Sequence, residues 1–439
     1  MKRLINIITM KKLLIIGTLL VANSLIAQQT PAKDQSKSVL IVGATAHIGD
    51  GSIIEKSFIG FENGIINLVT SEYELDKNNY DTIINAYGKH LYPGFIALNS
   101  NLGLVEVNSV KASVDDDESG DFLPNVRSII AYNAESKGVE SMRPNGVLLA
   151  QITPNGGIIS GSSSVVQLDA WNWEDAAISF DEGIHLNWPS PYSFGRWWLG
   201  EDRGLKIDTN YVNQTRKIEE FFEKSKATMN INLSMNLKSR AMKGIFNGDK
   251  TIYLHADDEK EIIDGISFLK KNNISKIVLV GGTGSASLIS FLKENNVPVI
   301  LTQPYRFPSE ADTDPRDTYK IANKLVKNGI LVSINPNGTG QQRVATRNLP
   351  FYAGSFSSYG LDKEEALSLI TLNAAKILDL DHKLGSIEVG KDATLFISEG
   401  DALNIMTNNL LKAYISGRSI SLETHQTKLW KRYSNKFSN

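Results

Sequence analysis

The pattern of hydrophobic and polar positions changes twice along the chain. Between residues 39 and 85, short apolar runs alternate with tight turns, and Asn63-Gly64 between two such runs is a strong hairpin signal. The same pattern returns between residues 394 and 418. Because both ends have this character around a different middle, the sequence predicts a small composite β-sandwich formed by residues 38–92 and 387–425.

The middle of the chain alternates apolar runs with helix-like segments, which is typical of βα units. The runs that we interpret as strands cover residues 95–101, 146–153, 165–168, 184–188, 251–256, 276–281, 297–302 and 331–335. Eight such units predict an α/β fold with a (β/α)8 TIM-type barrel over residues 93–386. The loop at about residues 103–145 is unusually long and would lie at the active-site face.

Two helix starts in the predicted barrel have clear capping signals. Asp257 or Asp258 can cap a helix whose Ile262, Ile266 and Leu269 share one face. Asp362 with Glu365 forms an acidic variant of a capping box.

The N-terminus has the layout of a secretory signal peptide. Basic residues precede an apolar stretch over residues 13–22, and small and polar residues follow as far as Ala27-Gln28. A membrane anchor needs about 20 apolar residues, and this stretch is shorter. We therefore expect residues 1–27 to be removed, leaving no stable membrane anchor and a periplasmic or secreted protein.

Composition narrows the range of functions. The 439 residues are 41% hydrophobic, which is enough for a barrel and a second domain. The formal charge of −2, with interspersed signs, offers no basic field for nucleic acid. The absence of cysteine excludes disulfides, lipoprotein attachment and thiolate metal sites. A small molecule or another protein is the expected partner.

Three stretches together resemble a known family. They are Asn63-Gly64-Ile65-Ile66, Tyr92-Pro93-Gly94-Phe95-Ile96, and the pair of segments 373–378 and 384–393. Over about residues 39–418 the chain resembles the amidohydrolase superfamily, in particular its imidazolonepropionase-like group. The resemblance implies a barrel with a composite sandwich, hydrolysis of C–N bonds other than peptide bonds, and zinc or another divalent metal as cofactor.

The same resemblance indicates where the metal ligands should stand. The His-x-His pair of the first barrel strand falls on Asn99 and Asn101, and the histidine of the fifth falls on His255. The ligand of the sixth strand falls on Gly281, and the aspartate of the eighth falls on Asn335. Neutral amides are poor zinc ligands, and one histidine cannot hold a catalytic metal. We therefore expect no metal cofactor and a catalytically degenerate site, that of a pseudoenzyme.

Several residues remain as candidates for other roles. His255 and Asp257 could act in catalysis, although a strand-end histidine and a helix cap are the simpler interpretations. The segment 184–188 offers no match for the bridging lysine or glutamate of two-metal members. Arg127, Arg143 and Asn337 are candidates for contact with a ligand.

Three further stretches have two interpretations each. The acidic run 115–118 could bind a hard cation or be a solvated loop. The Gly/Ser-rich segment 154–164 could form an anion-binding nest or a tight connector. Tryptophans near the third and fourth strands could line a cleft, or cover the barrel wall or a subunit interface.

The leading hypothesis is an exported, degenerate amidohydrolase-superfamily protein. It would bind a small ligand or pair with a related amidohydrolase subunit, as a homo- or hetero-oligomer. The alternative is an active C–N hydrolase with a rearranged site around His255, and a third interpretation is a scaffold in a cell-envelope complex.

Overall fold

The computed structural model describes residues 30–72, 79–195, 197–202, 204–228, 236–307, 313–337 and 342–437. The predicted signal peptide, residues 1–27, lies outside the described residues. The unit described below is Ala32–Asn439. Across the described ranges, no helix is long and apolar enough to cross a membrane.

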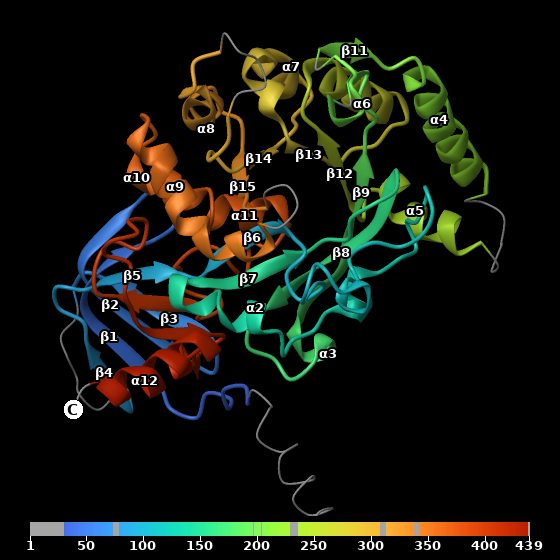
Figure 1. The fold of residues 1–439 in the computed structure, drawn as a ribbon. Helices are drawn as coiled ribbons and strands as arrows, with labels where there is room; N and C mark the ends of the chain where they lie inside the picture. The colour runs from blue at the N-terminus through green and yellow to red at the C-terminus, as the bar shows by residue number, and fades with distance from the viewer. Residues whose placement is uncertain are drawn as a thin grey trace, which may run out of the picture. The chain divides into compact units, whose positions relative to one another are not determined.

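Strands from both ends of the chain form one mixed sheet of eight strands, with the order β18-β17-β16-β5-β1-β2-β3 and β4 paired to β1. The strands are β1 Val39–His47, β2 Ile53–Glu62, β3 Ile65–Thr70, β4 Thr82–Asn85, β5 His90–Pro93, β16 Leu395–Ser398, β17 Leu410–Ile415 and β18 Arg418–Ile420. Figure 1 shows the blue and red segments side by side. The predicted joining of the two ends is confirmed.

Local sequence explains much of this sheet. Asn63 and Gly64 connect β2 to β3 with φ values of 52° and 81°, as a two-residue hairpin turn with positive φ at both positions requires. Ile41, Phe61 and Leu395 are fully buried in a hydrophobic cluster shared by both ends of the chain. Burial of these side chains therefore depends on both ends being present.

The second sheet also has eight strands, in the order β15-β14-β13-β12-β9-β8-β7-β6. Its strands are β6 Phe95–Ser100, β7 Val147–Ile152, β8 Ile159–Gln167, β9 Ala177–Asn187, β12 Thr251–Ala256, β13 Ile277–Gly281, β14 Val299–Thr302 and β15 Val332–Asn335. The terminal strands β15 and β6 lie against each other, so the barrel is nearly closed. The predicted α/β barrel is confirmed.

One strand of the barrel runs opposite to the others. β8 pairs antiparallel with both β7 and β9, whereas all other neighbours in this sheet are parallel. The sequence predicts a connector over residues 154–164, but β8 already begins at Ile159. The remaining link is too short for a crossover helix, and Gly156 and Gly157 turn it with φ values of 80° and 58°. The connector and nest interpretations of 154–164 therefore apply at most to its first residues.

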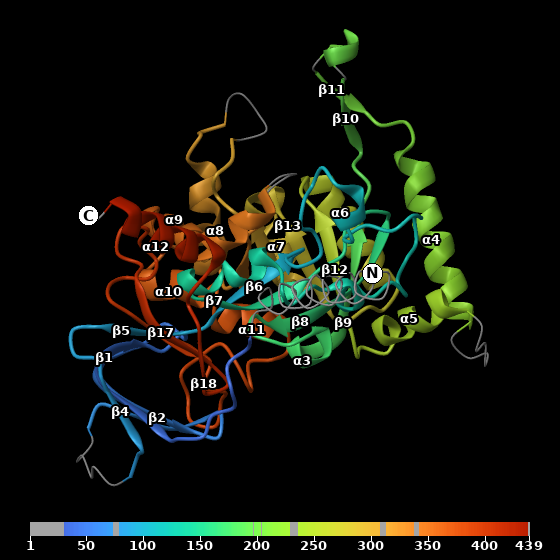
Figure 2. The ribbon, with the colours of Figure 1, turned by 60° about the horizontal axis from the view of Figure 1, so that its bottom comes forward.

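Helices cover the barrel, as Figures 1 and 2 show. They are α2 Lys137–Glu140, α3 Trp173–Ala176, α4 Tyr211–Thr228, α5 Leu237–Phe246, α6 Glu259–Lys271, α7 Ile289–Glu294, α8 Asp317–Lys327, α9 Leu349–Ser358, α10 Lys363–Ser368 and α11 Leu372–Ile377, followed by the C-terminal α12 His425–Phe437. A small hairpin joins β10 Tyr192–Phe194 to β11 Leu205–Ile207.

The capping predictions are resolved in detail. Asp258, not Asp257, caps α6, and Glu261 completes a capping box. Asp362 and Glu365 form the predicted box at the start of α10. Ile262, on the predicted apolar face of α6, is fully buried. These features depend on residues close in sequence, so the sequence alone could predict them.

Candidate functional site

The carboxyl ends of the barrel strands bring together the positions that the resemblance assigns to a metal. Asn99 lies near the end of β6, His255 near the end of β12, Gly281 at the end of β13 and Asn335 at the end of β15. The backbone of Asn99 has φ 51°, in the left-handed region that asparagine tolerates better than most residues. We call this end of the barrel the mouth.

The asparagines of the mouth are held by hydrogen bonds. Asn101 Nδ2 donates to Asp116 Oδ2 at 2.9 Å, and Asp116 also accepts from Asn155 Nδ2 at 2.8 Å. The side chain of Asn337 donates from Nδ2 to the backbone oxygen of Asn99. Its backbone N–H donates to Asn335 Oδ1 at 3.0 Å. These contacts tie the ends of β6 and β15 to the loops that follow them.

Two of these asparagines have a side-chain oxygen that accepts no hydrogen bond from the described residues. Asn101 is 5% exposed, and its Oδ1 is buried without a hydrogen-bond partner among the described residues. The Oδ1 of Asn337 is in the same situation. A buried acceptor without a donor costs about 1–3 kcal/mol, and a ligand with an N–H or O–H group would recover this free energy.

His255 forms a pair with a second histidine, His185 on β9. His185 Nδ1 lies 2.8 Å from His255 Nε2, and His185 Nε2 lies 2.9 Å from Ser163 Oγ. His185 is fully buried and stacks on the Tyr253 ring at a centroid distance of 4.7 Å. The site residues predicted from the sequence do not include His185, because this strand was compared only with the lysine or glutamate of two-metal members. The available signal was that both histidines lie in strands of the barrel.

The histidine pair continues into a partly buried carboxylate, Glu182. Glu182 Oε1 accepts from Ser163 Oγ at 2.5 Å and from Gln151 Nε2 at 2.7 Å, and its Oε2 accepts from the Tyr253 hydroxyl at 2.8 Å. Gln151 Oε1 in turn accepts the backbone N–H of Asn99 at 2.9 Å. A polar network therefore connects β6, β7, β8, β9 and β12 inside the barrel. Glu182 and Gln151 are likewise absent from the site residues predicted from the sequence.

Burial determines the charge states in this network. Burial lowers the pKa of His185 well below its ordinary value. It also lowers the pKa of His255 to about 4, against a smaller opposing effect of Asp257. Burial raises the pKa of Glu182, whereas the hydrogen bonds from Gln151, Ser163 and Tyr253 favour its charged form and lower it. At neutral pH both imidazoles are therefore neutral.

The hydrogen bonds then assign a direction to each proton when Glu182 is ionised. The single hydroxyl proton of Ser163 goes to Glu182, so Ser163 accepts from His185 Nε2. A neutral imidazole has one donor and one acceptor nitrogen, so His185 Nδ1 accepts from His255 Nε2. His255 Nδ1 is left as a lone-pair acceptor, and it makes no hydrogen bond within the described part of the chain.

Asp257, the other catalytic candidate, fixes a turn at the mouth. Its Oδ1 accepts from Thr283 N at 3.2 Å and from Thr283 Oγ1 at 2.9 Å. These bonds hold the segment after β13. Arg306, in the loop after β14, is close enough for Asp257 to raise its pKa against the larger, opposite effect of burial. Among the described residues the Arg306 guanidinium makes no hydrogen bond. It is a cation of the mouth that was not among the site residues predicted from the sequence.

Arg127 lies in the long loop and bridges it to β9. Its Nε is 2.6 Å from Asp181 Oδ2. Arg127 also lines a cavity of ≈ 530 Å³ together with Asp115, Asp116 and Glu118. Asp116 is 3% exposed, so the acidic run is not simply a solvated loop. Throughout the described ranges, no group of three or more histidine, aspartate or glutamate side chains is arranged to hold a metal ion.

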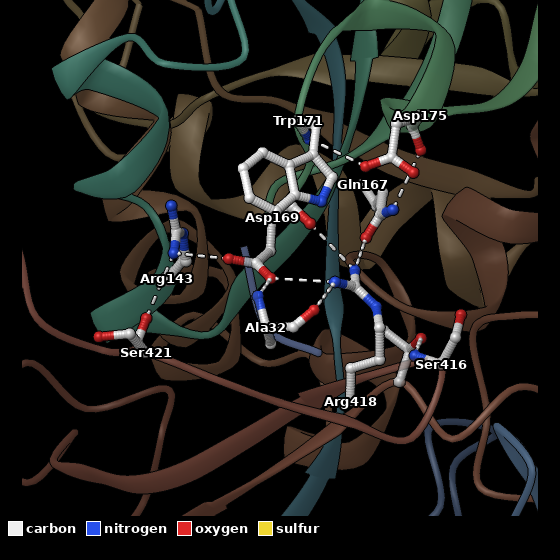
Figure 3. A network of polar contacts seen from close by, with 10 residues as sticks. Ala32, Arg143, Gln167, Asp169, Trp171, Asp175, Ser416, Arg418 and Ser421 are labelled. Carbon is white, nitrogen blue, oxygen red and sulfur yellow. Dashed lines mark hydrogen bonds and ion pairs between the residues drawn. The ribbon is translucent and has the colours of Figure 1, made fainter. Parts of the chain in front are cut away.

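Arg143 lies elsewhere, just before the amino end of β7. Figure 3 shows its guanidinium beside Asp169, with Nη1 3.0 Å from Oδ1. Asp169 also accepts from Arg418 Nη1 at 3.1 Å and from the backbone N–H of Ala32 at 2.8 Å. The mouth lies at the carboxyl ends of the parallel strands, so this location does not support the expectation that Arg143 contacts a ligand there. The cluster instead joins the barrel to the chain's two terminal segments.

The tryptophans divide between wall and surface. Trp188 is 7% exposed and packs against Phe268 of α6. Trp171 and Trp198 are 60% and 66% exposed. The prediction that the tryptophans cover the barrel wall therefore holds for Trp188, but not for Trp171 and Trp198.

Comparisons with known proteins agree with this architecture. Residues 218–421 match the model of the amidohydrolase family. A 5'-deoxyadenosine deaminase from Methanobrevibacter smithii is 23% identical over 360 residues, covering 76% of this chain and 78% of that protein. A crystal structure of an amidohydrolase from Thermotoga maritima MSB8 has a TM-score of 0.75 at 22% identity, covering 87% of this chain and 99% of that chain. A Xaa-Pro dipeptidase with bound methionine has a TM-score of 0.55 at 14% identity, covering 88% and 100% respectively.

The match to the amidohydrolase model covers residues 218–421, and the solved structures share the fold of this chain. The solved structures are too distant in sequence to indicate more than the fold. The imidazolonepropionase-like group therefore remains a prediction.

Proposed function

We propose that the protein is an exported member of the amidohydrolase superfamily that binds a small polar ligand at the mouth without a catalytic transition metal. The observation that carries this proposal is the hydrogen bond from Asn101 Nδ2 to Asp116. It turns the donor side of the amide toward a carboxylate and leaves a neutral, buried oxygen on the other side. Export rests on the layout of the first 27 residues.

The residues present do not fit the metal that the resemblance implies. A catalytic zinc site takes three or more imidazole or charged ligands with one position left open. Asn99, Asn101 and Asn335 offer neutral amides, and Gly281 offers no side chain. His255 supplies the remaining imidazole, and its Nε2 already bonds His185. We therefore derive no hydrolytic step through a metal.

The chemistry of the mouth defines the ligand class. Three acceptor atoms of the mouth have no donor among the described residues: Asn101 Oδ1, Asn337 Oδ1 and His255 Nδ1. The Arg306 guanidinium adds a cation that suits a carboxylate, phosphate or other acceptor. A small molecule with several N–H or O–H donors and an acceptor or anionic group fits this set. The deaminase relative is named for a nucleoside, which makes 5'-deoxyadenosine a rational first probe.

Metal content and ligand binding test the proposal together. Mature protein exposed to zinc and manganese should hold well below one equivalent of either by elemental analysis. One or two equivalents would contradict the proposal. In calorimetric titrations with 5'-deoxyadenosine and related nucleosides, His255→Ala should weaken any binding, whereas His382→Ala should not, because His382 is exposed outside the mouth. A ligand that binds both variants equally would also contradict it.

The histidine pair favours a second candidate, metal-independent hydrolysis of a C–N bond. His255 Nδ1 could accept a proton from water as the water oxygen attacks the carbon, and then return that proton to the leaving nitrogen. Turnover by metal-free protein that disappears in His255→Ala and persists in His382→Ala would establish this candidate and overturn binding without catalysis. No turnover by wild-type protein would leave the first proposal standing.

A partner role is a further part of the proposal. The protein would then bind its ligand as a subunit beside a related, active amidohydrolase. Co-purification of such a protein at constant ratio from the native cell envelope would support this, and a clean monomer would count against it.

A further inference from the structure

The C-terminal helix α12, His425–Phe437, lies on the outside of the fold with none of its side chains buried. Its start is anchored, because the backbone N–H of His425 donates to Glu140 Oε1 at 2.6 Å. Lys428 N donates to the backbone oxygen of Thr424 at 2.9 Å, which continues the first turn. The helix is therefore attached at one end and open along its length.

The apolar side chains of α12 occupy one face. Leu429, Trp430, Tyr433 and Phe437 follow a spacing of one, three and four residues, which places them along one stripe of a helix. Trp430 is 69% exposed, Tyr433 55% and Phe437 79%. Large aromatic side chains exposed together on one face mark an interaction surface.

The rest of the helix is basic. Lys428, Lys431, Arg432 and Lys436 lie within the helix, and no acidic residue does. Lys431 Nζ pairs with Glu423 just before the helix at 2.9 Å. Arg432 and Lys436 lie 5.6 Å from the ring centres of Tyr433 and Phe437. The chain as a whole has a formal charge of −2, so α12 is a local concentration of positive charge beside an aromatic stripe.

We propose that α12 docks on an anionic lipid surface. A helix with a basic polar face and Trp, Phe or Leu on the other face lies in the plane of a membrane interface. Tryptophan and tyrosine prefer that interface because their rings are partly polar. Anionic headgroups complement Arg432 and Lys436, which border the stripe, and Lys431 adds a cation farther round the helix. The proposal is independent of the ligand at the mouth.

A lipid surface fits these residues better than a groove in a protein. Helices that fill a protein groove present anchors spaced along an apolar face, and α12 is short and mostly aromatic there. Arg432 and Lys436 lie next to the rings, where they can reach headgroups while the rings enter the interface. Binding by this helix alone would be reversible and sensitive to salt.

Flotation of the mature protein with vesicles tests the proposal. The protein should float with phosphatidylcholine vesicles that contain phosphatidylglycerol, and only weakly with phosphatidylcholine alone. The triple variant Lys431→Gln, Arg432→Gln, Lys436→Gln should lose affinity by on the order of 100-fold, at about fivefold per basic residue. The variant Trp430→Ala, Tyr433→Ala, Phe437→Ala should lose about tenfold or more.

Matched controls separate α12 from the general surface. Lys217→Gln, Lys224→Gln, Lys226→Gln removes three exposed charges from α4, and Trp171→Ala removes an exposed ring elsewhere. Both controls should float like the wild type. All variants should keep the wild-type thermal midpoint, because none of the α12 side chains is buried.

The proposal would be overturned if the wild type fails to float with either vesicle, or floats equally well with both. It would also be overturned if the α12 variants float like the controls. Capture of a soluble protein through α12 without vesicle binding would assign the helix to a protein partner instead.

Discussion

His185 Nδ1 and His255 Nε2 lie 2.8 Å apart, one on β9 and the other on the neighbouring β12. The bond makes the protonation of each ring depend on the other, because two neutral imidazoles can share only one proton between these atoms. Through Ser163 the pair also depends on Glu182. The mouth is therefore coupled to the interior of the barrel by hydrogen bonds.

Acid should destabilise the protein through this pair. The pKa of His255 is lowered to about 4 in the folded state, and that of an unfolded histidine is about 6.5. Between these values the unfolded chain binds more protons, so the free energy of unfolding falls as pH falls. For His255 alone we expect a loss of about 2 kcal/mol between pH ~7.5 and pH ~5. Urea unfolding at both pH values measures it.

The variant His255→Gln supplies the comparison for the acid effect. Its free energy of unfolding should change less between the two pH values than that of the wild type. Equal pH dependence in the two proteins would show that His255 is protonated as readily when folded as when unfolded.

Removal of the Glu182 carboxylate should lower the free energy of unfolding. Glu182→Ala leaves the Ser163 and Tyr253 hydroxyls and the Gln151 amide without their acceptor. We expect a loss of about 3 kcal/mol or more in chemical denaturation. The control Glu220→Ala removes an exposed carboxylate 3.7 Å from Arg216 and should cost less than about 0.5 kcal/mol. Similar losses in both variants would contradict a structural role for the buried network.

The buried ion cluster of Figure 3 should join the termini to the barrel. Asp169→Ala leaves Arg143 and Arg418 without their shared carboxylate, and we expect a loss of about 3–5 kcal/mol. Glu399→Ala breaks an exposed pair with Lys89 and should leave the free energy of unfolding close to that of the wild type. Hydrogen exchange at Ala32 should accelerate in the Asp169 variant, because its N–H loses its acceptor. Unchanged exchange at Ala32 would argue against this anchoring.

At Asn99 the glycine variant should be more stable than the alanine variant, which is the reverse of the usual order. At φ 51°, Asn99→Gly should be more stable than Asn99→Ala by about 1 kcal/mol, because the left-handed region is costly for a residue with a Cβ. Asn101 has no positive φ and serves as the control. There alanine should be more stable than glycine by about 0.5–1 kcal/mol. The same ranking at both positions in thermal unfolding would contradict the described backbone.

Features that depend on near neighbours were predictable from the sequence. The Asn63-Gly64 hairpin and the Asp362–Glu365 capping box need only adjacent residues. Seven of the eight barrel strands run as the alternating pattern predicts, and the joining of the two ends followed from their shared pattern. The candidate positions Asn99, Asn101, Gly281 and Asn335 could be named because a family motif has fixed places in a strand.

The remainder depends on contacts between distant residues. The reversed direction of β8 depends on its antiparallel pairing with β7 and β9. In the sequence alone, the serines of this strand have the composition of a connector. The His185–His255 contact joins residues 70 apart in the chain, and Arg143 meets Asp169 and Arg418 only in the folded protein. The sequence by itself determined the local elements and the resemblance to a family, because both are recorded in short stretches. The tertiary structure alone decided which polar groups meet. Buried polar groups without hydrogen bonds cost free energy, so they bond to whichever groups the fold places beside them.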